Sequence, residues 1–323
     1  EYSFLTEVDS IIIRKSLFHL DDAFQRFFKK LGKYPKFKSR FSNNSYSTSA
    51  IYGSYKGKKY CNIEINFMKR MIKLPKLKWI TFRGYRNLEN LSGKIMNATI
   101  SKEANGKYYV SIVCEISSIK DFHIIPISIV GLDLGIKKLI TLSDSKTFDN
   151  NKYILKYEKQ IKRCQRSLSR KEKGSKNYYK CKQKLAILHS KLKNARKYYI
   201  HTITKKITDI YDIIATESLS SKHMLKDKHL SKSIQDTSFY EIIRQLHYKS
   251  NWKGKYFYQI DKYYPSSQTC SVCSHIDKKY KDLTERVYKC SNCSQEIDRD
   301  LNASINIMFE GLKLHMKNNI SVI

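Results

Sequence analysis

The positions of four of the chain's eight cysteines constrain its fold more than any other feature. They form two Cys-x-x-Cys pairs with 16 residues between the pairs: Cys270, Cys273, Cys290 and Cys293. A two-residue gap lets both thiolates of a pair reach one ion, and two pairs complete a tetrahedral zinc site. Because four thiolates leave no open coordination position, we expect a structural Zn(2+) in a ribbon at residues 261–296. Free or disulfide-bonded cysteines are the alternative interpretation.

The other four cysteines have no framework spacing: Cys61, Cys114, Cys164 and Cys181. This pattern is typical of a reducing compartment and not of a secreted disulfide scaffold. The sequence contains neither a signal peptide nor an apolar stretch of about 18 residues, so we expect a cytoplasmic protein without a membrane partner.

The formal net charge of +33 predicts a polyanionic partner, because a surplus of this size is self-repulsive in a compact fold. Nucleic acid is the expected polyanion, since phosphate neutralisation by Lys and Arg supplies most non-specific affinity. A merely soluble basic protein and a protein of anionic membrane surfaces are the alternatives. The predicted contacts lie in a basic-aromatic loop and a basic helical stretch: Lys36, Lys38 and Arg40, then Lys162, Arg163, Arg166, Arg170 and Lys171.

Hydrophobic periodicity divides the chain into several kinds of segment. Residues 1–32 predict a helix whose apolar face packs on a core, and residues 46–120 predict short strands of a small barrel or sandwich. One of these strands is expected at 61–67, where the residues alternate with period two. Residues 152–208 predict a basic helical hairpin, broken at Gly174 and Ser175. A polar segment without regular structure is expected at 218–237, followed by helices at 239–248 and 301–316.

Two apolar strands and the last helix each carry a carboxylate near one end. Strand 128–135 contains Asp133, strand 210–216 ends at Glu217, and Asp300 begins the helix. A carboxylate in an apolar strand is costly unless something positive neutralises it. If the strands are neighbours, the three acids converge at one sheet edge. There they would hold two Mg(2+) ions about 3.5–4 Å apart, able to activate water against a phosphodiester.

Each acid also has an ordinary explanation. Asp133 could cap a turn, Glu217 could be a surface residue at a strand end, and Asp298 or Asp300 could be a helix N-cap. Other catalytic arrangements lack support, because the sequence has no phosphate-binding glycine loop and no identifiable Ser-His-Asp arrangement.

Several segments resemble the transposon-encoded TnpB (OrfB) family. The runs GLDLG at 131–135, ATESL at 215–219 and DRDLNASINI at 298–307 are similar to the three acidic motifs of a RuvC-type nuclease. YPSSQTCSVC at 264–273 resembles the opening of the family's zinc ribbon. YPKFKSR at 34–40 and IKLPKL at 72–77 also resemble TnpB segments, so the resemblance covers essentially the whole chain.

The resemblance implies an α/β fold built around an RNase H-like (RuvC) nuclease domain with an inserted zinc ribbon. The expected order is a partial helical recognition segment at 1–45, then a β-barrel-like wedge domain at 46–126. The nuclease domain follows at 127–260 and contains the basic hairpin at 152–208. The ribbon at 261–296 and a nuclease-domain helix at 297–323 complete the chain.

The resemblance also implies an activity. The family's RNA, made from the transposon end, pairs with target DNA, and the RuvC-type site cuts that DNA with Mg(2+). This would make the chain a metal-dependent, RNA-guided DNA endonuclease of a bacterial or archaeal transposon, associated with the nucleoid. The catalytic and magnesium-binding roles fall on Asp133, Glu217 and Asp300. Asp300 is preferred over Asp298 because the family's acid precedes an Asn by two positions, here Asn302.

The chain departs from the family pattern in two ways. Ser274 and Ser294 stand where the family has Gly after the second Cys of each pair, which predicts slightly strained turns. The sequence also begins later than family members do, without the first wedge strand and further recognition helices. A nuclease-inactive or truncated RNA-guided DNA-binding protein, or a transposon regulator, is therefore the alternative function. A junction-resolving or RNase H-like nuclease without a guide is a further enzymatic rival.

Overall fold

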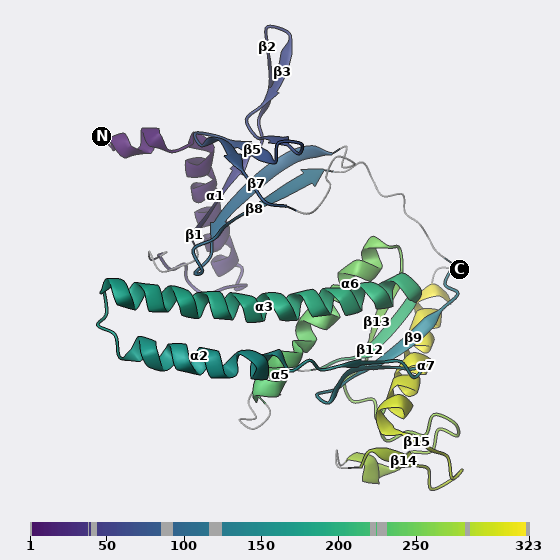
Figure 1. Cartoon of the computed structure of the whole chain (residues 1–323). Coiled ribbons are helices and arrows are strands. Elements are labelled where there is room, and N and C mark those ends of the chain that lie inside the picture. The colour runs from purple at the N-terminus through teal and green to yellow at the C-terminus, as the bar shows by residue number, and fades with distance from the viewer. Residues whose placement is uncertain are drawn as a thin grey trace. The chain divides into compact units, whose positions relative to one another are not determined.

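The computed structural model describes residues 2–37, 39, 44–84, 93–115, 125–219, 224, 231–281 and 285–320. The chain divides into two compact units, Glu1–Lys120 and Asp121–Ile323, which are described separately (Figure 1). None of the helices in these ranges combines the length and the apolar character that crossing a membrane requires.

Unit 1 contains a helix and two small antiparallel sheets. After the 3-10 helix η1 (Ser3–Glu7), helix α1 covers Ser10–Phe28. One sheet has the order β1-β7-β8, formed by Asn44–Ser49, Lys94–Lys102 and Tyr108–Glu115. The other has the order β4-β5-β6, formed by Glu64–Asn66, Met71–Leu74 and Lys78–Thr81. A separate hairpin pairs β2 (Tyr52–Tyr55) with β3 (Lys58–Cys61).

One apolar core joins the two sheets of unit 1. Its buried members come from both sheets and the chain between them: Ile63, Ile72, Leu74 and Ala98. The predicted β-rich character of 46–120 is thus confirmed for the described residues, including the turn at Asn105 and Gly106, where Gly106 has φ 83°.

Two expectations for unit 1 were wrong. The predicted strand at 61–67 is split, because β3 ends at Cys61 and Ile63 enters the core before β4 begins. Helix α1 exists, but it has no buried residue; Leu17 and Phe28 are 64% and 70% exposed. An apolar stripe predicts an amphipathic helix but not what covers it.

Unit 2 is built on a five-stranded mixed sheet with the order β11-β10-β9-β12-β13. The strands are β9 (Ile129–Leu134), β10 (Lys138–Leu142), β11 (Thr147–Asp149), β12 (Ile213–Glu217) and β13 (Tyr256–Ile260). Strand β9 pairs antiparallel with β10 and parallel with β12, and β12 pairs parallel with β13. The predicted strands at 128–135, 139–142 and 255–261 are confirmed. The strand predicted at 210–216 begins only at Ile213, because α3 continues to Ile210, and β11 was not predicted.

Helices cover both faces of this sheet. On one face, α3 (Lys176–Ile210) and α6 (Phe239–Trp252) pack through residues such as Ile203 and Leu246 against Leu132 and Ile214. On the other face, Ile307 of α7 (Arg299–Ile320) packs against Ala215 and Ile260. Neighbouring residues of β9 and β12 therefore face different helices, as the twofold period of a strand requires.

The basic helical hairpin is confirmed. Helix α2 (Tyr153–Ser169) and α3 run side by side, as Figure 1 shows, and Gly174 supplies φ +96° in the turn between them. The polar segment at 218–237 is not wholly irregular, because Ser231–Thr237 forms helix α5. Asp236 holds α5 to the hairpin: it accepts hydrogen bonds from the Ile154 amide at 3.1–3.2 Å and pairs with Arg196 Nε at 2.6 Å.

Helix α7 lies unusually close to the sheet. A Cβ on Gly131 would lie 2.0 Å from the Ser304 carbonyl oxygen and 2.4 Å from the Met308 nitrogen. Gly311 of α7 lies against the neighbouring strand, β12, where an added Cβ would be 2.3 Å from the Ala215 Cβ. Glycine at both positions is what allows the helix backbone to approach β9 and β12.

We predict that Gly131→Ala destabilises unit 2 by about 3 kcal/mol or more, because the added methyl meets backbone atoms that cannot rotate away. Urea unfolding followed by circular dichroism measures this loss. Gly32→Ala is the matched control: its Cβ meets nothing nearer than 3.9 Å, so a change within about 0.5 kcal/mol is expected. Equal midpoints for the two variants would contradict the close approach.

Candidate active site and metal centre

The three predicted carboxylates share the α7 side of the sheet. Gly131 of β9 and Ala215 of β12 meet α7, and Asp133 and Glu217 lie two residues further along the same strands. Residues two apart in a strand project from the same face. Asp300 lies in the first turn of α7. Two strands and a helix, far apart in sequence, thus bring their acids to one place.

Asp133 and Glu217 form a hydrogen-bonded pair. Burial raises the pKa of Asp133 well above its usual range, and the negative charges of Glu217 and Asp300 raise it further. Burial also raises the pKa of Glu217, against hydrogen bonds from the Asp133 carboxyl and the Leu134 amide that lower it. Without a cation, burial and the neighbouring negative charges therefore oppose the joint ionisation of the two carboxyls.

Asp298 and Asp300 have different environments. Asp298 Oδ1 accepts hydrogen bonds from the amides of Asp300 and Leu301 at 3.0 and 3.1 Å, so Asp298 caps α7. Its other oxygen pairs with Lys138 Nζ at 3.2 Å. Asp300 faces the Asp133–Glu217 pair and lies 3.8 Å from Arg286 Nη1. The N-cap interpretation thus applies to Asp298, and Asp300 is the acid of the two whose charge raises the pKa of Asp133.

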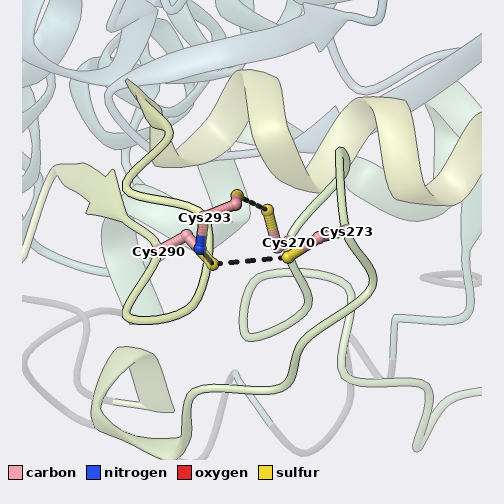
Figure 2. A group of neighbouring side chains, drawn as sticks. All are labelled: Cys270, Cys273, Cys290 and Cys293. Carbon is pink, nitrogen blue, oxygen red and sulfur yellow. Dashed lines mark hydrogen bonds between the residues drawn. The ribbon is translucent and has the colours of Figure 1, made fainter.

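The four predicted cysteines come together near the N-terminal end of α7 (Figure 2). They lie on two loops of a small domain that contains the 3-10 helix η2 (Lys278–Lys281) and the strands β14 (Val287–Lys289) and β15 (Glu296–Asp298). Within the described ranges, this is the one group of acids, cysteines or histidines whose ligand atoms all lie within 4.8 Å of one another. The three carboxylates are less tightly gathered.

The sulfur positions fit a tetrahedral zinc ion. Sulfurs bound to zinc at about 2.3 Å lie about 3.8 Å apart. Here the Sγ atoms of Cys270 and Cys293, and those of Cys273 and Cys290, are separated by 3.6 Å. The four-cysteine cluster therefore has the donors and the spacing of a structural zinc site.

The pKa shifts of the thiols also fit a site that binds a cation. The Asn292 amide lies 3.5 Å from Cys273 Sγ, and its hydrogen bond is the main cause that lowers the pKa of Cys273 to about 6. For Cys293 the Gln295 amide lowers the pKa, but burial and the neighbouring thiols outweigh it and raise the pKa to about 12. Without a cation the cluster thus favours ionisation of Cys273 and opposes that of Cys293, and a bound cation would favour the thiolate form of both.

The two knuckle loops repeat one backbone pattern. The amide of Ser274 donates to the Cys270 carbonyl at 2.9 Å, and the amide of Ser294 donates to the Cys290 carbonyl at 3.1 Å. Both serines have positive φ, 60° and 57°, in the left-handed region that favours glycine. The strain predicted from serine at these positions is confirmed.

Two asparagines that the sequence analysis gave no role join the ribbon to α7. Asn302 Nδ2 donates to the Thr269 carbonyl at 2.7 Å, and its Oδ1 accepts from the Ser271 amide at 2.9 Å. Asn306 Nδ2 donates to the carbonyls of Ser266 and Thr269 at 2.8 and 2.7 Å. Both side chains are buried, on the helix that carries Asp300. Their spacing of four residues on one helix face could have indicated such a contact.

The predicted nucleic-acid contacts are in part brought together. Five of them line one groove of about 750 Å³ along α2, together with Lys159 and Ser167: Lys162, Arg163, Arg166, Arg170 and Lys171. Lys36 lies in unit 1, beside Phe37 at an apolar groove along α1. Lys38 and Arg40 lie outside the described residues.

Family models match two parts of the chain. The model described as "Cas12f1-like, TNB domain" matches residues 239–307, which include the cysteine cluster, α7's first turns and Asp300. The OrfB model described as "Probable transposase" matches residues 123–228, which include Asp133, the basic hairpin and Glu217.

Curated relatives match most of the chain. The "Putative RNA-guided DNA endonuclease InsQ" of Escherichia coli K12 is 32% identical over 96% of this chain and 77% of its own length. A "Putative RNA-guided DNA endonuclease" of Streptomyces pristinaespiralis is 31% identical over 97% of this chain and 74% of its own length. The "TnpB-like protein L79" of Acanthamoeba polyphaga mimivirus is 27% identical over 43% of this chain and 27% of its own length.

Among solved structures, a Cas12f1–sgRNA–target DNA complex matches with a TM-score of 0.43 and 16% identity, covering 88% of this chain and 74% of that chain. The identity to InsQ over nearly the whole chain, together with the two family models, assigns the family. The chain belongs to the TnpB (OrfB) family of transposon-encoded proteins.

Proposed function

We propose that this protein is an RNA-guided DNA endonuclease that hydrolyses phosphodiester bonds at Asp133, Glu217 and Asp300. The observation that carries the proposal is the meeting of these acids on the α7 side of the sheet, in a chain whose relatives bear the name RNA-guided DNA endonuclease. The positive charge of Arg299 lowers the pKa of Asp133, but burial and the charges of Glu217 and Asp300 outweigh it. The mutual repulsion of the three acids is what a divalent cation relieves.

The donor set fits Mg(2+), which prefers carboxylate oxygens. Asp133, Glu217 and Asp300 would hold it, and the bound metal supplies activation of water and stabilisation of the leaving oxygen. The protein's own residues do the positioning. The Leu134 amide orients Glu217, and the Asp298 cap fixes the first turn of α7, from which Asp300 projects.

We assign unit 2 to the RNase H-like (RuvC) class. The support is its strand order, with two antiparallel pairs (β10 with β11 and with β9) beside the parallel trio β9-β12-β13, together with helices on both faces and the ribbon inserted before α7. Unit 1 we assign to a wedge domain, 46–126, preceded by a partial recognition segment, 1–45. Its two sheets around one core support that assignment.

The basic groove of α2 is the proposed surface for the guide RNA or its duplex with target DNA. Six lysines and arginines line this open groove together with Ser167, and no acid belongs to the lining. Phosphates there would replace the repulsion among these cations by attraction. We propose further that the guide derives from the transposon end, as in the family.

The test of the function is purification from cells that carry the flanking transposon DNA, followed by sequencing of the bound RNA. The complex is then given Mg(2+) and a plasmid whose target matches the RNA's guide part next to a randomised flank. A discrete RNA and cutting at the matched site are expected. A protein that binds its target with RNA but never cuts it would establish the alternative, a nuclease-inactive binding protein.

The same cleavage assay, applied to variants of each acid, distinguishes their roles. Asp133→Ala and Asp300→Asn should each slow cleavage at least about 100-fold, because they remove part of the metal's stabilisation of the transition state. Asp298→Asn should stay within a few-fold of wild type, since Asn caps a helix as well as Asp does. Cleavage lost in Asp298→Asn and kept in Asp300→Asn would reverse the assignment.

The raised pKa of Asp133 predicts a pH-dependent cost of folding in magnesium-free buffer. The folded protein holds this proton more tightly than the unfolded chain, so stability falls as pH rises from about 4 through the raised pKa. Asp133→Asn removes the cost. At pH 7 the variant should unfold at a higher temperature than wild type, because it has no carboxyl at this position whose ionisation the fold opposes. The advantage should vanish below about pH 4, and added Mg(2+) should stabilise wild type only. A variant less stable than wild type at pH 7 would contradict the buried pair.

The zinc assignment is tested at the strained serines. Ser274→Gly and Ser294→Gly should each slow zinc release to a chelator and stabilise the ribbon by about 0.5–1 kcal/mol, after the extra freedom of unfolded glycine is offset. A zinc-sensitive dye follows the release. Ser271→Gly is the control with opposite sign, because Ser271 has no positive φ and glycine there only loosens the chain. Faster release from all three variants would refute the strain.

A further inference from the structure

The β2–β3 hairpin of unit 1 projects from the sheets, as Figure 1 shows. Along its length every side chain except those of Gly53 and Cys61 is exposed. Two isolated strands are marginally stable in water, because they have no third element against which to bury a face. A projecting two-stranded hairpin that nevertheless has regular strand pairing is typical of a surface that binds a partner.

The base of the hairpin is firmly held. Asn62 Oδ1 accepts from the Ile51 amide at 2.6 Å, and Asn62 Nδ2 donates to the Ser49 carbonyl at 3.1 Å. Tyr52 Oη donates to the Ile95 carbonyl of β7 at 2.9 Å. These contacts attach both strands to the β1-β7-β8 sheet.

The tip is equally well defined. Lys56 and Gly57 both have positive φ, 49° and 76°, which is the type I′ turn that matches the twist of a two-residue hairpin. The register pairs Tyr55 with Lys58 and Gly53 with Tyr60. Hydrogen bonds at the base and a two-residue turn at the tip thus define both ends of the arm.

One face of the hairpin is an aromatic platform. Paired residues share a face, so Tyr55, Lys58 and Tyr60 lie together. A Cβ on Gly53 would lie 2.6 Å from the Tyr60 ring, which means that the ring lies flat across the glycine. Tyr55 and Tyr60 are nevertheless 69% and 51% exposed. Two exposed tyrosine rings thus lie on one face of the hairpin.

The charge of the hairpin has one sign. Lys56, Lys58 and Lys59 lie between Ala50 and Asn62, where the sequence has no acid. Lysine beside exposed tyrosine suits a ligand that offers phosphates and flat rings together. A protein partner of acidic character would use the lysines but not the platform. A base-paired duplex would hide its rings, so the fitting ligand has unpaired bases.

We propose that the β2–β3 hairpin binds unpaired bases of folded RNA, with Tyr55 and Tyr60 as the stacking platform and the three lysines on the phosphates. The proposal rests on the proposed function, which supplies a resident RNA. Within that function it assigns a specific arm of unit 1 to the RNA itself, separate from the α2 groove.

Ultraviolet cross-linking of the purified complex, followed by digestion and mass spectrometry, tests the placement. A peptide spanning residues 51–61 should carry RNA. Tyr55→Ala/Tyr60→Ala should lower affinity for the re-transcribed RNA roughly tenfold or more, and Tyr55→Phe/Tyr60→Phe should stay near wild type because stacking needs the ring and not the hydroxyl. Gly53→Ala, which lifts the Tyr60 ring, should weaken binding in part. Tyr263→Ala, another strongly exposed tyrosine, is the control for losing any surface ring.

Unchanged RNA affinity in the double alanine variant, or absence of the 51–61 peptide from the cross-links, would overturn the proposal. So would a loss confined to a DNA duplex or to a captured protein. None of the variants touches either core, and equal thermal unfolding confirms that they fold. If wild type itself carries no RNA, the proposed function fails first; if wild type carries RNA and cuts while the hairpin variants behave like it, only this inference fails.

Discussion

The close approach of α7 to β9 and β12 is the constraint on which the rest of unit 2 depends. A Cβ at Gly131 or Gly311 would clash across the contact between helix and sheet, so the position of α7 along the strands is narrowly set. The first turn of α7 then brings Asp300 to the strand carboxylates, and Asn302 and Asn306 fix the ribbon. One helix thus connects the acidic site to the cysteine cluster.

Much of this arrangement was predictable from sequence, because its elements carry strong local patterns. Apolar runs ending in Asp133 and Glu217 predicted the inner strands, and cysteine spacing predicted the cluster. Local patterns could not decide which residues meet through contacts between distant segments. Asp298 and Asp300 differ by two residues, and only the start of α7 makes one a cap and the other part of the site. The assignment of catalytic roles stays a prediction.

Other differences between the predicted and the observed elements also arise from tertiary contacts. Ile63 enters the core of unit 1 and interrupts an alternating run that would otherwise make one strand. Helix α5 forms in a polar segment because Asp236 gains a buried ion pair with Arg196 and the amide at the start of α2. Helix α1 has the predicted stripe, yet its burial depends on what surrounds it, which periodicity does not contain.

The charge of the α2–α3 hairpin is only locally compensated. Glu158 is shared by Lys162 of the groove and Lys232 of α5, and both hydrogen bonds lower its pKa to about 2. Phosphates that engage Lys162 would therefore leave Glu158 to Lys232 alone. Glu158 therefore links nucleic-acid binding in the groove to the position of α5, a helix that follows Glu217 in the sequence.

The hydrogen bonds of Asn302 and Asn306 to Ser266 and Thr269 have a consequence for how the family's ribbons can be exchanged. A ribbon transplanted between relatives at its cysteines alone would arrive without its docking partners on the recipient's helix. The exchangeable module is the ribbon together with the first two turns of α7, and the module boundary runs through the helix and not between the domains.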